Sequence, residues 1–389
     1  MSTDVVISGI GFSKIGRKLE SSGMALTLDA AIAALADAGL DRSDIDGLST
    51  YPGGMNGDPF SPIGGPDLKA ALGLELNWFS GSSEGGAQLV AFFNAYAAIK
   101  AGLARHVMCF RTVKEGTGGA SWAKTASAAA ERRRVDGEYQ WMLPFNSISA
   151  TNWIAPAAMK HFHLYGTTRE QLAQVALNGR RNAALNPNAV FQTPLTMDDY
   201  LGSRMISTPL CLFDCDPPTD GSTVIILSSA EAARDLKQKP IRIEAVGTAA
   251  RGNLTWDQTE LPWNVAFDSA ASLWSRTDLK PADVDVAELY DGFSFLTLIW
   301  LEALGFCGVG ESGAFVEGGA RIALDGALPL NTHGGQLSGG RTHGFGLVHE
   351  AVMQLRGSAG ARQVANDPQV AVVAAGGGPM AGSMLLTTD

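Results

Sequence analysis

The chain contains an internal repeat, which limits its possible folds more than any other sequence feature. Segments 26–51, LTLDAAIAALADAGLDRSDIDGLSTY, and 265–290, VAFDSAASLWSRTDLKPADVDVAELY, each predict an amphipathic helix, an Asp-x-Asp turn and a short strand that ends at a tyrosine. One constant offset pairs Asp44 with Asp283, Asp46 with Asp285 and Tyr51 with Tyr290. The sequence therefore predicts a duplicated α/β fold.

The later parts of the two halves also correspond. Residues 82–110 and 338–377 each contain a glycine-rich loop, a helix and an apolar strand. This alternation of strand and helix predicts a mainly parallel sheet in each half. We expect an N-terminal half at 1–238, with a helical insertion at about 114–207, and a C-terminal half at 239–389. Such an insertion is typical of a lid or a substrate-binding element.

Composition and charge exclude several classes of protein. With 389 residues, 46% apolar and 17% charged, the chain can bury a sizeable core. Its net charge of −10 argues against nucleic acids and anionic membranes as partners. The sequence has no signal-peptide pattern and no apolar stretch of membrane-spanning length, so we expect a cytoplasmic protein.

The candidate ligand patterns predict neither a metal site nor a nicotinamide cofactor. The four cysteines lack zinc-ligand spacing, and Cys211 and Cys215 are expected to pack as small apolar groups. His161 and His163 lie two residues apart, which places them on different faces of a helix. The loop GIGFSKIG at 9–16 lacks the G-x-G-x-x-G spacing of a dinucleotide-binding turn.

Several ordered motifs over nearly the whole chain resemble the thiolase superfamily. The resemblance is strongest to its sterol-carrier-type and thiolase-like lipid-transfer members, including the steroid side-chain aldolases. The motifs are YGTTREQLAQVALNGRRNAALNPNA, PLCLFDCDPPTDGSTVIILSS, ELYDGFS, NTHGGQLSGGRTHGFG and AAGGGPMAG. The resemblance implies a five-layered αβαβα thiolase fold built from two α/β halves. It also implies a homodimer and a small zinc-ribbon/OB-fold accessory protein.

The same resemblance implies that the catalytic cysteines are missing. Gly85 stands at the position of the family's nucleophilic cysteine, Ala374 at its second cysteine, and Arg341 at its activating histidine. Tyr290, in Y-D-G-F, stands at the family's Asn or His position. Thiolysis through an acyl-cysteine is excluded, because it needs a thiolate.

A site of this kind can still stabilise the enolate of an acyl-CoA. The resemblance therefore implies a lyase that cleaves a β-hydroxyacyl-CoA by retro-aldol chemistry. The expected substrate is a steroid or bile-acid side-chain thioester with a tertiary hydroxyl, and the products are a ketone and a short acyl-CoA such as propionyl-CoA. CoA belongs to the substrate, so no cofactor is expected. Two alternatives stay open: a non-catalytic lipid or acyl-CoA binding protein, and an acyltransferase that uses Ser82 or Ser83.

Tyr290 is the candidate general base. A free tyrosine has a pKa of about 10, so this role needs a cationic neighbour or a hydrogen-bond relay. The alternative is a half-buried strand tyrosine whose hydroxyl is hydrogen-bonded. Asp291 alternates to the other face of the strand and is expected to be a structural carboxylate.

Arg341 and His343 complete the predicted catalytic set. Arg341 could lower the pKa of the tyrosine or hold an anionic intermediate, or it could simply pair with a carboxylate. His343 could protonate the intermediate, or it could cap the following helix. Related aldolases carry a second tyrosine around here, whereas this chain has Arg341, so the full tyrosine pair is not carried over.

Five residues are expected to contact the acyl-CoA. The glycines lie in the nucleophile-like loop and in the terminal glycine-rich loop, where backbone N–H groups can approach a ligand. His333 could face the site, or it could serve loop packing. The residues are Gly85, Gly86, His333, Gly377 and Gly378.

Overall fold

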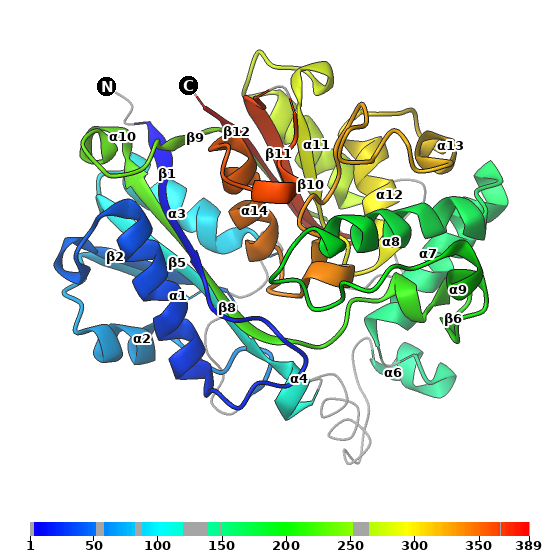
Figure 1. The fold of residues 1–389 in the computed structure, drawn as a ribbon, viewed down its shortest axis with the longest axis horizontal. Coiled ribbons are helices and arrows are strands. Elements are labelled where there is room, and N and C mark those ends of the chain that lie inside the picture. Colours follow the sequence, from blue (N-terminus) through cyan, green and yellow to red (C-terminus); the bar gives the residue numbers. More distant parts are fainter. Residues whose placement is uncertain are drawn as a thin grey trace.

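The protein is described by a computed structural model, shown as a ribbon in Figure 1. The described residues are 4–51, 58–81, 88–119, 139–147, 149–251, 264–365 and 367–388. None of their helices is long and apolar enough to cross a bilayer.

One mixed sheet runs through both halves of the chain. Among the described residues it has nine strands in the order β10-β11-β12-β9-β1-β8-β5-β2-β3. The two halves join where β1 pairs antiparallel with β9. The strands are β1 (Val5–Phe12), β2 (Gly47–Thr50), β3 (Trp78–Gly81), β5 (His106–Lys114), β8 (Asp220–Ser229), β9 (Ile241–Ala250), β10 (Val286–Leu289), β11 (Val370–Gly377) and β12 (Met380–Thr387).

The prediction of a mainly parallel sheet is wrong. Only β2 with β3, β2 with β5, and β10 with β11 run parallel among the paired strands of this sheet. β12 is antiparallel to β11 because a tight turn after Gly377 joins them, and a short hairpin cannot connect parallel strands. β8 is antiparallel to both β1 and β5.

Helices and sheet form five layers, as the resemblance implied. Helix α1 (Gly23–Ala38) packs on the outer face of β1 and β8, and α11 (Val265–Trp274) packs on β9 and β12. Helices α3 (Val90–Lys100) and α14 (Phe345–Leu355) lie between the two parts of the sheet, in the centre of Figure 1. The rings of Phe92 and Phe345 meet there, with centroids 4.4 Å apart.

The repeat is also visible in equivalent hydrogen bonds at the beginning of β5 in the first half and of β11 in the second half. The Asp46 carboxylate accepts the backbone N–H groups of Arg105 and His106, just where β5 begins. The Asp285 carboxylate accepts those of Gln369 and Val370, just where β11 begins. Each carboxylate therefore ties a short strand to its parallel neighbour in the same way.

Close glycine contacts also recur. In each half the first helix crosses its strand at a glycine, Gly11 in β1 and Gly247 in β9. A Cβ at Gly11 would overlap the carbonyl oxygen of Ala30 in α1, and one at Gly247 would overlap that of Ser269 in α11. The backbones of helix and strand are too close for any side chain at these two positions.

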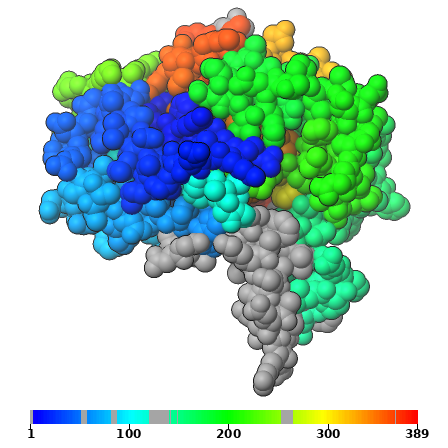
Figure 2. Space-filling view, turned by 60° about the horizontal axis from the view of Figure 1, so that its bottom comes forward, coloured from blue at the N-terminus to red at the C-terminus, as the bar shows by residue number. Residues whose placement is uncertain are grey.

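The segment between β5 and β8 is largely helical where it is described. Helix α7 (Ala150–Tyr165) and helix α8 (Arg169–Ala184) agree with the helical character predicted for this insertion. His161 of α7 is buried against Glu302, with Nε2 2.8 Å from Oε1, while His163 is exposed. The two histidines therefore lie on different faces of the helix, as expected. Figure 2 shows this green segment beside the blue N-terminal residues.

Helix α8 fixes the position of a loop from the C-terminal half. Asn178 and Asn182 each donate to the carbonyl of Leu330, at 2.9 and 3.0 Å. Asn186 donates to the carbonyl of His333 at 3.0 Å. The segment thus supports the loop that carries the candidate site. The domain limits at 238/239 and the function of the insertion stay predictions.

The remaining elements are mostly short, but α12 (Ser294–Ala303) is a buried helix that packs against α11 and α8. The others are η1 (Arg42–Asp44), α2 (Gly65–Leu72), α4 (Glu115–Gly118), α6 (Tyr139–Met142), η2 (Leu143–Phe145), α9 (Met197–Leu201), β6 (Met205–Ser207), β7 (Leu210–Cys211), η3 (Leu212–Asp214), α10 (Ala230–Ala233), η5 (Pro281–Asp283), α13 (Ser312–Val316), η6 (Gly335–Gly339) and η7 (Gly360–Arg362).

We predict that Gly11→Ala and Gly247→Ala each lower the free energy of unfolding by about 1–3 kcal/mol, because the added methyl group must push helix and strand apart. Gly65→Ala is the matched control, since a Cβ there would meet Leu48 at an ordinary 3.7 Å. Denaturant titration measures all three. Equal stability of the Gly11, Gly247 and Gly65 variants would contradict the close contacts.

Candidate active site

Tyr290 lies at the carboxyl end of β10, beside the end of β11. Its backbone N–H donates to the carbonyl of Ala374 at 2.9 Å, and its own carbonyl accepts the Thr297 hydroxyl at 3.3 Å. The side chain is 8% exposed and lies against Gly292, where a Cβ would be 2.8 Å from the phenol oxygen. The ring position thus depends on the absence of a side chain at residue 292.

Asp291 anchors the loop 331–344 to this strand end. Its buried carboxylate accepts the backbone N–H groups of Gln336 at 2.8 Å and Leu337 at 3.3 Å, in the π-helical turn η6. Gly335 has φ +61°, and a Cβ there would overlap the same carboxylate. Burial raises the pKa of Asp291 to about 6, although these backbone bonds oppose the shift. Asp291 is a structural carboxylate, as expected.

Arg341 forms two ion pairs. Its guanidinium contacts Glu115, which follows β5, and Asp216, which precedes β8, with Nη1 3.2 Å from the Asp216 Oδ1. The side chains of Glu115 and Asp216 are 2% and 6% exposed. The charge of Arg341 is therefore compensated by two carboxylates, which is the alternative that the sequence left open.

Asp216 connects Arg341 to the turn beside Tyr290. Its backbone N–H donates to the carbonyl of Gly292 at 3.0 Å, while its carboxylate binds Arg341. The structure therefore brings Arg341 into the neighbourhood of Tyr290 through one intermediate residue.

His343 is buried next to a second arginine. Nη2 of Arg111, a β5 residue, donates to Nδ1 of His343 at 3.0 Å, and the ring of Phe60 lies against the imidazole with centroids 4.5 Å apart. Burial and the charges of Arg341 and Arg111 hold the pKa of His343 well below 6.5. The ring is thus neutral at pH 7, and since Nδ1 accepts, Nε2 carries the proton. These surroundings do not favour His343 as an imidazolium acid. Helix α14 starts at Phe345 with Gly344 at its N-cap, so His343 is not the cap either.

His333 lines a narrow cleft that contains neither Tyr290, Arg341 nor His343. Its Nδ1 lies 3.2 Å from the Glu288 carboxylate. Burial alone would lower the pKa of His333, but Glu288, with Glu350 and Asp291 further away, raises it. The cleft has room for about 50 Å³, the scale of one or two water molecules rather than a thioester. Its lining residues are Phe12, Ile15, Asn186, Asn188, Thr223, His333, Gly339, Gly340, Gly346, His349, Glu350 and Arg362.

The predicted glycine contacts divide into two groups. Gly377 and Gly378 are described, and they form the end of β11 and the turn that follows, with φ +128° and +73°. They lie at the same sheet edge as Tyr290, because Leu289 of β10 is in register with Ala374 of β11. Gly85 and Gly86 lie outside the described residues. The contact roles of all four glycines, and of His333, stay predictions.

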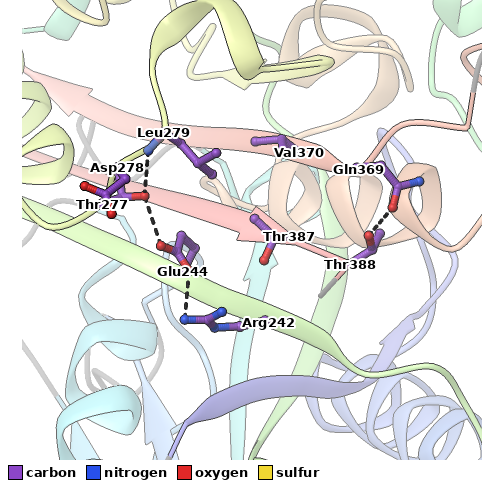
Figure 3. Close-up of a pocket in the computed structure, with 9 residues that line it drawn as sticks. All are labelled: Arg242, Glu244, Thr277, Asp278, Leu279, Gln369, Val370, Thr387 and Thr388. Carbon is purple, nitrogen blue, oxygen red and sulfur yellow. Dashed lines mark hydrogen bonds and ion pairs between the residues drawn. The ribbon is translucent and has the colours of Figure 1, made fainter.

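A separate surface groove lies at the opposite sheet edge (Figure 3). It measures about 350 Å³, but its polar side chains bind each other: Arg242 pairs with Glu244 at 3.0 Å, and the Thr277 hydroxyl donates to Glu244 at 2.9 Å. Val370 in its wall is the first residue of β11. The groove thus lies at the amino ends of β9 and β11, at the sheet edge opposite Tyr290, whereas ligands of open α/β sheets bind beyond the carboxyl ends of the parallel strands. We therefore do not assign the active site to it. Its lining residues are Arg242, Glu244, Thr277, Asp278, Leu279, Gln369, Val370, Thr387 and Thr388.

Sequence reasoning missed Arg111, Glu115 and Asp216. A signal existed for Arg111, which is a charged residue inside the largely apolar strand HVMCFRTVK and is fully buried. Asp216 stands in DCDPPTDG, where a second acidic residue in a buried segment carries the same signal. Charges in such positions need partners, and the partners here come from distant parts of the chain.

Comparisons of the whole chain with known proteins show its family. The thiolase C-terminal domain-like family matches residues 247–387. The 17-hydroxy-3-oxo-4-pregnene-20-carboxyl-CoA lyase of Mycobacterium tuberculosis is 35% identical over 99% of this chain and 100% of its own length. The chain belongs to the thiolase superfamily. The steroid side-chain-cleaving aldolase of Thermomonospora curvata is also 35% identical, over 97% of each chain. These matches cover the whole fold and not one motif.

A solved structure agrees with the sequence relatives. The Ltp2-ChsH2(DUF35) aldolase superposes with a TM-score of 0.87 and 32% identity, covering 99% of this chain and 98% of its own. The protein is thus a carbon–carbon lyase of the aldolase type within the thiolase superfamily, and not a classical thiolase.

We predict that Arg341→Met lowers the free energy of unfolding by about 3–5 kcal/mol, because it leaves two buried carboxylates without a counter-charge. Adding Glu115→Gln and Asp216→Asn to this variant should recover at least a third of the loss. Arg251→Met is the matched control: Arg251 pairs with Asp268 but its side chain is 70% exposed, so its removal should cost less than about 1 kcal/mol. Urea unfolding measures the set. No recovery in the triple variant would contradict the ion-pair assignment.

Proposed function

We propose that the protein cleaves the side chain of a steroid or bile-acid β-hydroxyacyl-CoA by a retro-aldol reaction. The products are a ketone and a short acyl-CoA such as propionyl-CoA. CoA enters and leaves as part of substrate and product, so the reaction needs no further cofactor.

One observation carries this proposal: the titratable side chain at the end of β10 is the phenol of Tyr290, and the residue beside it on β11 is an alanine. Tyr290 donates its N–H to Ala374, the residue at the position of the family's second cysteine. A site with a phenol and without that thiol suits proton transfer to and from oxygen rather than acyl transfer to sulfur.

The names of the relatives support the substrate class. A 17-hydroxyl and a 20-carboxyl-CoA on one steroid put the hydroxyl on the carbon β to the thioester carbonyl. That arrangement is the one a retro-aldol reaction requires. The carbon that bears the hydroxyl is tertiary, so the product is a ketone.

The proposed reaction has three steps. Tyr290, as the phenolate, takes the proton of the β-hydroxyl group. The bond between the α- and β-carbons then breaks, the hydroxyl oxygen becomes the ketone oxygen, and the electron pair passes into the thioester as an enolate. Finally the α-carbon takes up a proton, which the phenol of Tyr290 received in the first step. Every atom of the substrate is then accounted for in the two products.

Arg341 and His343 complete the proposed catalytic set. Arg341, through Asp216, holds the turn at Gly292, against which the Tyr290 ring lies. His343 acts as a neutral ring, whose Nε2–H is a hydrogen-bond donor.

We predict that Tyr290→Phe lowers kcat by about 10²–10⁴-fold, because the ring stays while the base is lost. The assay incubates the protein with β-hydroxyacyl-CoA thioesters without free CoA and detects the ketone and the short acyl-CoA by mass spectrometry. Tyr96→Phe, at a half-buried tyrosine of α3, is the matched control and should keep wild-type kcat. Wild-type turnover by Tyr290→Phe would remove Tyr290 from the mechanism.

The same assay tests the function itself. Release of the ketone without free CoA supports an aldolase. Release that requires free CoA would mean acyl transfer, and binding without release would mean a carrier protein; either result would overturn the proposal.

We also propose a homodimer that forms through the β3 edge. β3 ends the order of the described sheet, and Phe79 in it is 71% exposed. An exposed edge with a large apolar side chain is a ready surface for strand pairing with a second copy. We predict that the wild type has twice the 40.7 kDa mass of one chain by light scattering and that Phe79→Lys is monomeric.

Leu103→Lys is the control for the dimer experiment, because Leu103 is also exposed, at 53%, but lies in the turn after α3. A wild type that is monomeric at micromolar concentration would exclude the dimer. A dimeric Phe79→Lys variant would move the interface elsewhere.

A small zinc-ribbon/OB-fold protein is the proposed accessory partner. The support is the solved aldolase named with a DUF35 component. Co-expression and co-purification with such a protein test this.

We further propose that the enzyme works in the cytoplasm, since its four cysteines are all free, which suits a reducing compartment.

A further inference from the structure

Gln336 has one half of its amide bound and the other half unpaired. The side chain lies in η6 and the residue is 2% exposed. Its Oε1 accepts the backbone N–H of Gly344 at 3.2 Å. Because an N–H group needs an acceptor, this bond fixes which end of the amide is oxygen. Nε2 is then buried with no hydrogen-bond partner in the described part of the chain.

A second unpaired amide atom lies near the same glycine. Gln88, just before α3, has a buried Oε1 that also lacks a partner within the described residues. A Cβ at Gly344 would be 3.3 Å from the Cβ of Gln88, so the two glutamines flank Gly344. One offers a donor and the other an acceptor, yet they do not bond to each other.

Unpaired buried amide groups are expensive, at about 1–3 kcal/mol each, and native proteins keep few of them. A site that waits for a ligand is one reason to keep them. Here the ligand must offer an oxygen acceptor to Gln336 and an N–H donor to Gln88. An acyl thioester of CoA has both, in its carbonyl oxygen and in the amide groups of its pantetheine arm.

The position of Gln336 links it to the reacting centre. Its own backbone N–H is bound by Asp291, the residue after Tyr290. Gly344, which orients its side chain, packs against Ala375 of β11, next to the Ala374 carbonyl that accepts the Tyr290 N–H. Gln336 is thus held by two bonds at the strand end that carries Tyr290.

The reaction also needs a hydrogen-bond donor to the thioester oxygen, and the paired guanidinium of Arg341 is not free to provide it. Cleavage puts negative charge on the thioester oxygen, and a donor aimed at that oxygen lowers the barrier. The guanidinium of Arg341 is already engaged by Glu115 and Asp216. The unpaired N–H₂ group of Gln336 has no such competing partner among the described residues.

We propose that Gln336 is a catalytic residue that donates an N–H to the thioester oxygen and stabilises the acyl-CoA enolate. This proposal rests on the retro-aldol function for its substrate. The bond is present in the bound thioester and strengthens as the oxygen becomes anionic, so its loss lowers kcat more than it changes KM.

The informative variant is Gln336→Glu. It keeps the shape and the oxygen that accepts the Gly344 N–H, and it replaces the N–H₂ donor by a second oxygen. Gln192→Glu is the matched control, because Gln192 is an exposed glutamine that donates to the Pro187 carbonyl. Thermal unfolding of both variants establishes that they are folded. If Gln336→Glu does not fold, Gln336→Met gives the same test.

Two readouts separate this inference from the proposed function. The first is ketone release from a β-hydroxyacyl-CoA. The second is deuterium uptake at the α-carbon of propionyl-CoA in D₂O, which needs the enolate but no cleavage. Loss of one enolate donor should lower both rates by about 10²–10³-fold in Gln336→Glu, with KM changed less than fivefold and Gln192→Glu unchanged.

The outcomes divide as follows. Deuterium uptake by the wild type that Gln336→Glu loses supports the role of Gln336, even if no β-hydroxyacyl-CoA is cleaved and the aldolase function fails. Uptake by Gln336→Glu within threefold of wild type overturns it. A wild type that shows neither cleavage nor uptake also overturns it, because the site then stabilises no enolate.

Discussion

The ion pairs of Arg341 with Glu115 and Asp216 are the interaction on which the site depends. They join three segments that are far apart in the chain: the end of β5, the approach to β8 and the loop 331–344. None of these charges is stable alone in so buried a place, so each segment needs the other two. The loop that carries Gln336 and His343 is therefore held between the two halves, and its geometry is set before any substrate arrives.

This arrangement also decides which chemistry the thiolase frame can perform. Positive charge that is neutralised by two carboxylates contributes little to an incoming anion, and the positions of both family cysteines hold Gly85 and Ala374. In the proposed mechanism, neutral dipoles such as the Gln336 amide and the His343 ring then stabilise the negative charge. Dipoles of this kind suit an enolate, whose charge appears only as the bond breaks. In the proposed mechanism, a change in a few side chains thus suffices to turn this fold from acyl transfer to carbon–carbon bond cleavage.

Much of the fold follows from local sequence patterns. The structure contains the repeat, the helical insertion with α7 and α8, and the five layers, as expected. These features depend on apolar periodicity and on family motifs, and both can be recognised in short stretches of contiguous residues. Strand direction was not predictable in the same way, since the turn after Gly377 reverses the chain where the alternation of elements suggested a crossover.

The site was only partly predictable for a similar reason. Tyr290 and Asp291 end a recognisable strand, and Asp291 has the structural role that its position on the opposite face indicates. The partners of Arg341 lie more than a hundred residues away along the chain, so no local pattern reveals them. The neutral state of His343 depends on burial and on the charges of Arg341 and Arg111, and only packing brings Arg111 to it.

The two tyrosines of the repeat show what duplication makes possible. Tyr290 lies beside Ala374 at the end of the second half's inner strands, while its counterpart Tyr51 is buried in the first half beside the Arg111 guanidinium, 5.7 Å from the ring centre. Each stands after the same aspartate-tied strand, so both inherited one geometry. Both tyrosines are buried, but their neighbours differ, so the same position of the repeat can change its partners and its chemistry. A duplicated fold of this type can therefore acquire a new reaction in one half while the other half preserves the architecture.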